Sequence, residues 1–153
     1  MITAYKLVVP APKGDGTYQS LLGTMNITRS LRDPWVLRYS LHERTEALPG
    51  TLGLYAFSTQ KDISVFAQWK RNGSAVCVQG CGTLVPHSVL ACYAAPTWNL
   101  SRFYKHLEES GGAQVVAAWP LRRWIEWITE EIVFYSPIGT VLLQDFTPEE
   151  VIA

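Results

Sequence analysis

The sequence lacks an excess of either charge and any long hydrophobic run, and each absence excludes a class of function. Thirteen Lys and Arg residues balance thirteen Asp and Glu residues in the chain of 153. A non-specific nucleic-acid binder needs surplus Lys and Arg to neutralise phosphates, so the balance argues against a nucleic-acid partner. No run approaches the roughly 18 apolar residues of a membrane-spanning helix, so we expect no membrane partner.

Signals for export and for metal binding are missing as well. The N-terminus has no basic stretch followed by an apolar core, which is the pattern of a signal peptide. The three cysteines are an odd number, and without an export signal we expect reduced thiols and a cytoplasmic location. Cys77 and Cys81 have a spacing seen in zinc sites, with His87 and Cys92 farther along. Because Cys77 and Cys92 lie in apolar runs, where cysteine behaves as a small buried hydrophobe, we predict no metal site.

The motifs of several common enzyme classes are also absent. The chain has no phosphate-binding loop of the Gly-rich, Lys-ended kind, no Gly-x-Ser-x-Gly elbow and no His-Glu-x-x-His. It is instead rich in apolar and aromatic residues, with 48% hydrophobic content, six Trp and seven Tyr. This composition and length suit a single globular domain over residues 1–153, with aromatics that enlarge a core or line a pocket or interface.

Apolar periodicity and turn residues predict strands and helices without strict alternation. The expected fold is therefore α+β, a mostly antiparallel sheet of about seven strands with three to four helices packed on it. The expected strands cover residues 3–9, 35–41, 51–57, 75–85, 89–95, 114–119 and 139–144. The expected helices cover residues 60–71, 100–110 and 120–132, with a short terminal helix at 147–150.

Four local features refine this outline. Pro49 and Gly50 indicate a turn before the strand at 51–57. Thr59 is placed to cap the helix that follows, with Asp62 in its first turn. The glycines at 80 and 82 predict a bulge or bend, and we expect the strands at 74–85 and 89–95 to pair with each other.

The corner after the strand at 51–57 resembles the second motif of ADP-ribosyltransferase-like folds. In that family a strand ends in a Ser-Thr-Ser-type run, and the next helix packs under a nicotinamide pocket; here the run is Phe57 to Gln60, followed by Ile63, Phe66 and Ala67. The resemblance implies a pocket that could take NAD. Lys6 stands where the family has Arg or His, and no Glu follows until Glu108, so it implies a degenerate enzyme or an NAD-type nucleotide binder. The implied pocket residues are Tyr5, Lys6, Tyr55, Ser58 and Thr59.

Residues 50–100 are similar to small uncharacterised proteins of bacteria and their phages. The shared features are a Gly-Leu-Tyr-Ala-Phe core at residues 53–57, a Val-Pro-His segment at 85–87 and a Tyr-Ala-Ala-Pro ending at 93–96. This resemblance implies a shared fold and a bacterial or phage origin, and for a phage-encoded protein the host cytoplasm.

We interpret the chain as a non-catalytic binding or interaction protein, a host-directed accessory factor if it is phage-encoded, with no cofactor. Aromatic richness without a complete catalytic set favours this class, with a protein partner or self-association. The ADP-ribosyltransferase-like enzyme and a phage structural component stay open as alternatives. The expected interface residues are Trp69, Trp98, Trp127, Arg122 and Arg123.

Overall fold

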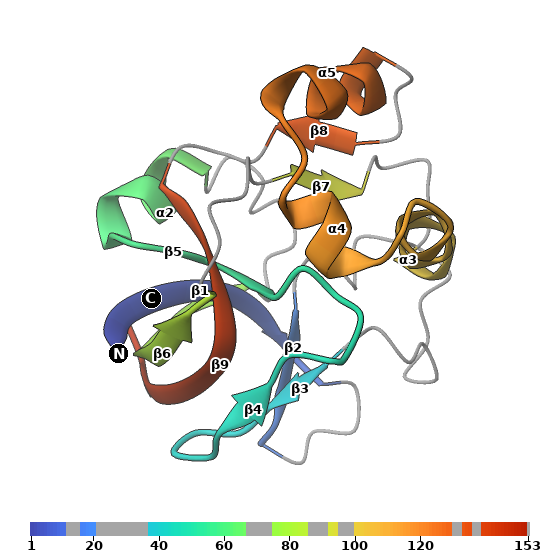
Figure 1. Ribbon diagram of the computed structural model, residues 1–153. Helices are drawn as coiled ribbons and strands as arrows, with labels where there is room; N and C mark the ends of the chain where they lie inside the picture. Colours follow the sequence, from blue (N-terminus) through green and yellow to red (C-terminus); the bar gives the residue numbers. More distant parts are fainter. Residues whose placement is uncertain are drawn as a thin grey trace.

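The computed structural model describes residues 1–11, 16–20, 37–66, 75–85, 92–94, 100–129, 133–135 and 139–152. Within these residues the strands are β1 (Ile2–Pro10), β2 (Tyr18–Ser20), β3 (Arg38–Tyr39), β4 (Thr45–Glu46), β5 (Leu54–Phe57), β6 (Val76–Leu84), β7 (Cys92–Ala94), β8 (Val133–Tyr135) and β9 (Thr140–Val151). The helices are α2 (Gln60–Phe66), α3 (Leu100–Glu109), α4 (Ala113–Ala117) and α5 (Leu121–Thr129). The α+β class is therefore confirmed (Figure 1).

Four of the strands close into a small barrel. β1 pairs with β5, β5 with β9, β9 with β6, and β6 again with β1, all antiparallel. The remaining strands of the seven-stranded sheet extend it, β2 and β3 from β1 and β4 from β9. Closure is possible because β1 and β9 are long and curve, so that each pairs with different neighbours along its length. β9 pairs with β5 through Thr140–Leu143 and with β6 from Leu143 onward.

The barrel is narrow, and its interior is filled by small residues facing large ones. The inner core contains Ala4 and Ala56 together with Leu143 and Phe146, all buried. A Cβ atom added to Gly80 would lie 2.2 Å from the Thr147 carbonyl oxygen and 2.9 Å from Phe146 Cζ. Glycine at position 80 therefore lets β6 and β9 approach closely enough to close the barrel around the Phe146 ring.

A second core lies on the outer side of β1 and β5, under α2. It contains Leu7, Phe57 and Ile63, with Ala75 and Cys77 from the start of β6. The odd residues of β1 serve this outer core and the even residues serve the barrel, as expected of a strand buried on both faces.

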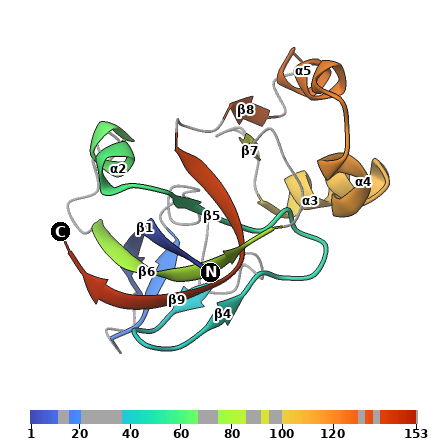
Figure 2. The same cartoon turned by 60° about the vertical axis from the view of Figure 1, so that its left-hand side comes forward.

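The other helices are not packed on the sheet in the way the sequence predicts. α2 packs against β1 and β5, whereas α5 packs against β8 and α3 against α4. We call α3, α4, α5, β7 and β8 the helical lobe. In both views this lobe lies on one side of the barrel and α2 on another (Figures 1 and 2).

Three predicted elements are wrong in type or partner. Of residues 114–119, predicted as a strand, residues 114–117 belong to α4 instead, because Gly111 and Gly112 turn the chain with φ of 113° and 93° and Val116 and Ala117 then pack inward. Residues 147–150, predicted as a helix, continue β9, because pairing with β6 outweighs the local helix preference. β6 pairs with β1 and β9 rather than with β7, which pairs with β8.

Other predictions are confirmed within their limits. The turn at Pro49–Gly50 is present, and the strand predicted at 51–57 begins at Leu54. A register irregularity lies between Gln79 and Gly80 as expected, although the extra residue is on β9. In α5 Trp124 is buried, whereas Ile125 is 43% exposed. The predicted strand at 35–41 is reduced to β3, and the predicted helix end at residues 72–73 lies outside the described residues.

Candidate functional site

The structure places Tyr5 and Lys6 on opposite faces of β1. Lys6 lies on the same face as Ala4 and Val8, is only 5% exposed, and donates a hydrogen bond from Nζ to the carbonyl oxygen of Tyr55. Its Nζ also lies 5.3 Å from the centroid of the Tyr39 ring. Burial lowers the pKa of Lys6 from 10.5 to about 8, because the charged ammonium loses its hydration. Tyr5 packs against the outer core instead.

Of the other three residues of the predicted pocket, Tyr55 contacts Lys6 through its backbone carbonyl oxygen. Ser58 and Thr59 are exposed at the end of β5, and Tyr55 lies half-buried on that strand. The Thr59 hydroxyl accepts a hydrogen bond from the Asp62 backbone N–H (3.2 Å) and donates one to the Asp62 carboxylate (2.6 Å). Thr59 therefore caps α2 as predicted. Of the predicted pocket residues, Lys6 is buried in the barrel, Tyr5 packs against the outer core, and Ser58 and Thr59 are exposed.

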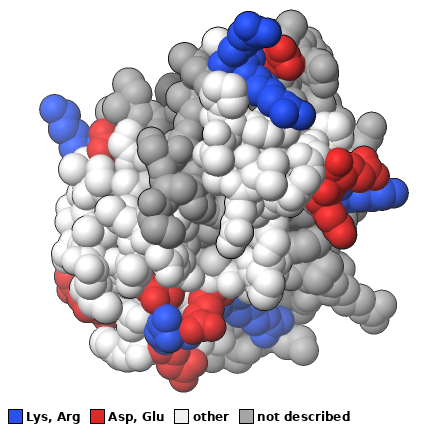
Figure 3. All heavy atoms as spheres, viewed as in Figure 1, with Lys and Arg blue, Asp and Glu red and all other residues white. Residues whose placement is uncertain are grey.

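The predicted interface is described only in part. Trp69 and Trp98 lie outside the described residues, as does the side chain of Trp127. Arg122 and Arg123 are exposed at the start of α5, where Figure 3 shows basic side chains at the top of the molecule. The Arg123 guanidinium carbon lies 4.3 Å from the centroid of the Trp119 ring, which is a cation–π contact.

The cysteines of the described residues have separate surroundings. Cys77 is buried in the outer core, and the Cys81 thiol donates a hydrogen bond to Glu149 Oε1 (3.1 Å). This hydrogen bond, followed by burial, raises the pKa of Cys81. Among the side chains that the structure describes, no three Cys, His, Asp or Glu residues gather as metal ligands; His87 and the Cys92 side chain lie outside this set.

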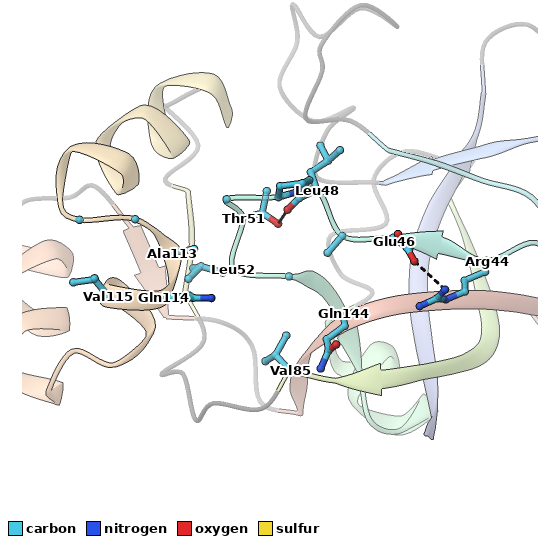
Figure 4. Close-up of a pocket in the computed structure, with 16 residues that line it drawn as sticks. Arg44, Glu46, Leu48, Thr51, Leu52, Val85, Ala113, Gln114, Val115 and Gln144 are labelled. Atoms are coloured by element: carbon cyan, nitrogen blue, oxygen red, sulfur yellow. Dashed lines mark hydrogen bonds and ion pairs between the residues drawn. The ribbon is translucent and has the colours of Figure 1, made fainter.

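A cavity of about 720 Å³ opens between the barrel and the corner that joins α3 to α4. Residues of both parts point into it, from the loop before β5 on one side and from α4 on the other (Figure 4). The described residues that line it are Arg44, Glu46, Ala47, Leu48, Pro49, Gly50, Thr51, Leu52, Gly53, Val85, Gly111, Gly112, Ala113, Gln114, Val115 and Gln144.

A rigid turn forms the barrel wall of the cavity. The Thr51 backbone N–H (3.2 Å) and its hydroxyl (2.7 Å) both donate to the carbonyl oxygen of Leu48. Pro49 and Gly50 occupy the central positions, and Gly50 has φ of 82°. This is the pattern of a type II turn, in which proline presets the second residue and glycine allows the positive φ of the third. Leu52, directly after the turn, is 1% exposed.

The floor is a β-bulge in β9. Thr83 pairs with Asp145 and Leu84 with Leu143, so Gln144 between them is left without an opposite residue. The Gln144 side chain donates a hydrogen bond from Nε2 to the Leu84 carbonyl oxygen (2.9 Å). The main-chain carbonyl oxygen of Gln144 accepts a hydrogen bond from the Ala47 N–H (2.8 Å). Gln144 thereby joins β9 both to the end of β6 and to the loop before β5.

Three charged groups form an ordered cluster at the rim. Arg44 donates to Asp145 Oδ2 from Nη2 (2.8 Å) and Nε (3.1 Å), and its Nη1 lies 2.8 Å from Glu46 Oε1. Asp145 Oδ1 accepts from the Thr83 backbone N–H (3.0 Å). Burial acts to raise the pKa of Asp145, but the hydrogen bonds from Arg44 and Thr83 outweigh it and hold the pKa below its usual value.

The cavity residues were not singled out by the sequence. Residues 43–49 lie between the predicted strands at 35–41 and 51–57, and Gly111 and Gly112 follow the predicted helix at 100–110. Both were recognisable as turns from their Pro and Gly residues. No sequence signal showed that the two turns, some sixty positions apart along the chain, face each other.

Comparison with protein-family models, with curated proteins and with solved structures gives no match to this chain. Among the helices of the described residues, none combines the length and apolar character that crossing a bilayer requires.

Proposed function

We propose that this chain is a non-catalytic binding protein of bacterial or phage origin that holds a partner in the cavity between the barrel and the helical lobe. The observation that carries the proposal is the cavity itself. Its volume of about 720 Å³ falls within the range of roughly 300 to 1,000 Å³ that is usual for ligand sites. Sites of this kind form preferentially where two parts of a fold meet, as they do here.

The chemistry of the described lining supports binding more than catalysis. The lining offers main-chain groups, small and aliphatic side chains, and the amides of Gln114 and Gln144. The charged side chains among its described residues, Arg44 and Glu46, contact each other. A pair engaged in this way orients and recognises a ligand, whereas acid–base or nucleophilic catalysis requires a group placed to exchange a proton or attack a substrate.

Two substitutions on α4 test whether the cavity is the binding site. Gln114 lines the cavity, and Gln114→Trp is expected to fill it. Ala118 is exposed beside α4 and is not among the lining residues, so Ala118→Trp is the matched control. Both positions are on the surface, so both variants are expected to keep the wild-type melting temperature.

The assay is a fragment screen followed by amide NMR shifts of the ¹⁵N-labelled chain, with NAD included as one compound. We expect the shifts of bound fragments to gather on residues 48–53 and 111–115, to vanish in Gln114→Trp and to persist in Ala118→Trp. Fragments that bind elsewhere, or that bind the filled variant equally well, refute the proposal. NAD hydrolysis by the wild-type chain would instead favour the ADP-ribosyltransferase-like alternative.

A further inference from the structure

We infer that the cavity takes an uncharged molecule that carries a carboxamide group beside a short aliphatic chain. The inference rests on the proposed function and adds the chemistry of the ligand. Three features of the described lining support it: its charged groups are paired with each other, its apolar side chains are aliphatic, and two glutamine amides remain for hydrogen bonds.

The charged side chains of the described lining are already paired. Arg44 Nη1 lies 2.8 Å from Glu46 Oε1, and Arg44 also donates to Asp145 Oδ2 from Nη2 (2.8 Å) and Nε (3.1 Å). An ionic ligand would therefore lose hydration on entering the cavity without gaining a counter-ion of its own. This cost falls on a carboxylate, a phosphate and an ammonium alike, so the lining favours an uncharged ligand.

The apolar part of the lining is aliphatic. Leu48, Val85 and Ala113 are each partly exposed, so a ligand can remove some of their apolar surface from water. The lining residues that the structure describes include no aromatic ring. Nucleobases bind proteins by stacking on aromatic side chains, with cations for their phosphates. A short aliphatic chain therefore fits this lining better than a nucleotide does.

Gln144 presents a hydrogen-bond acceptor of fixed identity. Its Nε2 donates to the Leu84 carbonyl oxygen (2.9 Å), so its side-chain oxygen Oε1 is left to accept from a ligand. A ligand N–H group can donate to this oxygen. A carboxylate has no donor, and its lone pairs would oppose those of Oε1, so Gln144 disfavours an acidic ligand in particular.

Gln114 offers a second amide from the opposite wall. Figure 4 shows its side chain pointing from α4 toward the barrel, with Gln144 on the barrel side beside Val85. With the other described residues Gln114 forms no side-chain hydrogen bond, so its N–H groups can donate to a ligand. A carboxamide matches both glutamines, because its N–H can donate to Gln144 Oε1 while its C=O accepts from Gln114 Nε2.

The test compares three probes that share one branched carbon skeleton and differ in the head group: 3-methylbutanamide, 3-methylbutanoate and 3-methylbutylammonium. Dissociation constants are measured by titration of the full ¹⁵N-labelled chain at neutral pH, followed by amide NMR shifts. Gln114→Glu replaces the α4 amide by a carboxylate. Gln60→Glu makes the same change in the first turn of α2, outside the lining, and is the control. Both positions are exposed, so both variants should keep the wild-type melting temperature.

We expect 3-methylbutanamide to bind the wild-type chain and Gln60→Glu about tenfold more tightly than either ion, with shifts on residues 48–53 and 111–115. In Gln114→Glu the ammonium should bind most tightly, because the new carboxylate is its counter-ion. The inference is overturned if either ion binds the wild type as tightly as the amide, if the amide does not bind, or if Gln114→Glu leaves the order unchanged. If screened fragments still bind the cavity in that case, the proposed function stands and only the ligand class is wrong.

Discussion

The buried amine of Lys6 predicts that the protein becomes more stable as the pH rises above neutrality. Lys6 lies inside the barrel, and its pKa falls from 10.5 to about 8 because burial disfavours the ammonium. A fall of this size, at about 1.4 kcal/mol for each pKa unit, makes the charged side chain cost about 3 kcal/mol of folding free energy. At pH 7 most of that cost is present, since the folded protein still carries the charge.

The direction of the pH dependence follows from proton binding. Between about pH 8 and pH 10.5 the unfolded chain holds the Lys6 proton while the folded chain has released it. The free energy of unfolding therefore increases with pH across this window and levels off above it. Lys6→Met removes the titrating group and keeps an unbranched side chain of similar length, so the variant should lack this contribution.

The magnitude can be measured as a difference between two proteins. At pH 7 Lys6→Met gains the roughly 3 kcal/mol of the buried charge and loses one hydrogen bond to Tyr55, worth about 1 kcal/mol. We expect it to be about 2 kcal/mol more stable than the wild type at pH 7 and slightly less stable at pH 10.5. Urea unfolding of both proteins from pH 7 to 10.5 measures this, with Lys61→Met at an exposed position of α2 as the control. A Lys6→Met stability difference that does not change with pH would show that Lys6 is not buried as a titrating amine.

Two further predictions concern the barrel and its rim. Gly80→Ala should destabilise the protein by about 3 kcal/mol in thermal unfolding, because the new Cβ meets the backbone of β9. Gly16→Ala, where nothing lies within 4 Å but φ is 82°, should cost only about 1 kcal/mol, and equal losses would contradict the crowding argument. Asp145→Asn should cost about 2 kcal/mol at pH 7. Because the pKa of Asp145 is lowered in the fold, this cost is full above about pH 4 and should shrink as the pH falls below it; a cost that is constant down to pH 2 would refute the ion pair.

Local features of the fold could be predicted from sequence because short-range physics determines them. The Thr59 cap depends on a hydroxyl three residues before an acceptor N–H, and the Pro49–Gly50 turn depends on backbone preferences of those two residues. The strand at the N-terminus and the helix that ends just before Gly111 follow in the same way from periodicity and a helix-breaking residue. These features depend on contacts between residues a few positions apart, so the local sequence is enough to predict them.

Predictions failed where distant parts of the chain compete with local preference. Thr147-Pro148-Glu149-Glu150 has the composition of a helix start, yet pairing with β6 draws it into β9. Gln114 to Trp119 reads as a strand, yet it has no strand partner among the described residues and forms α4 after a glycine corner. Lys6 and Tyr5, adjacent in the sequence, were assigned to one pocket, although alternation along β1 sends them to opposite faces.

The sequence by itself therefore determined the α+β class, the strands that become β1 and β5, the Thr59 cap and the turns that would line a cavity. Only the tertiary structure decided that β6 closes the barrel onto β1 and β9, and that the turn at residues 48–51 faces the corner at 111–112 across an open cavity. The physical reason is that strand pairing and cavity formation depend on contacts between residues far apart in the chain. Their free energy exceeds local propensity but leaves no periodic mark in the sequence.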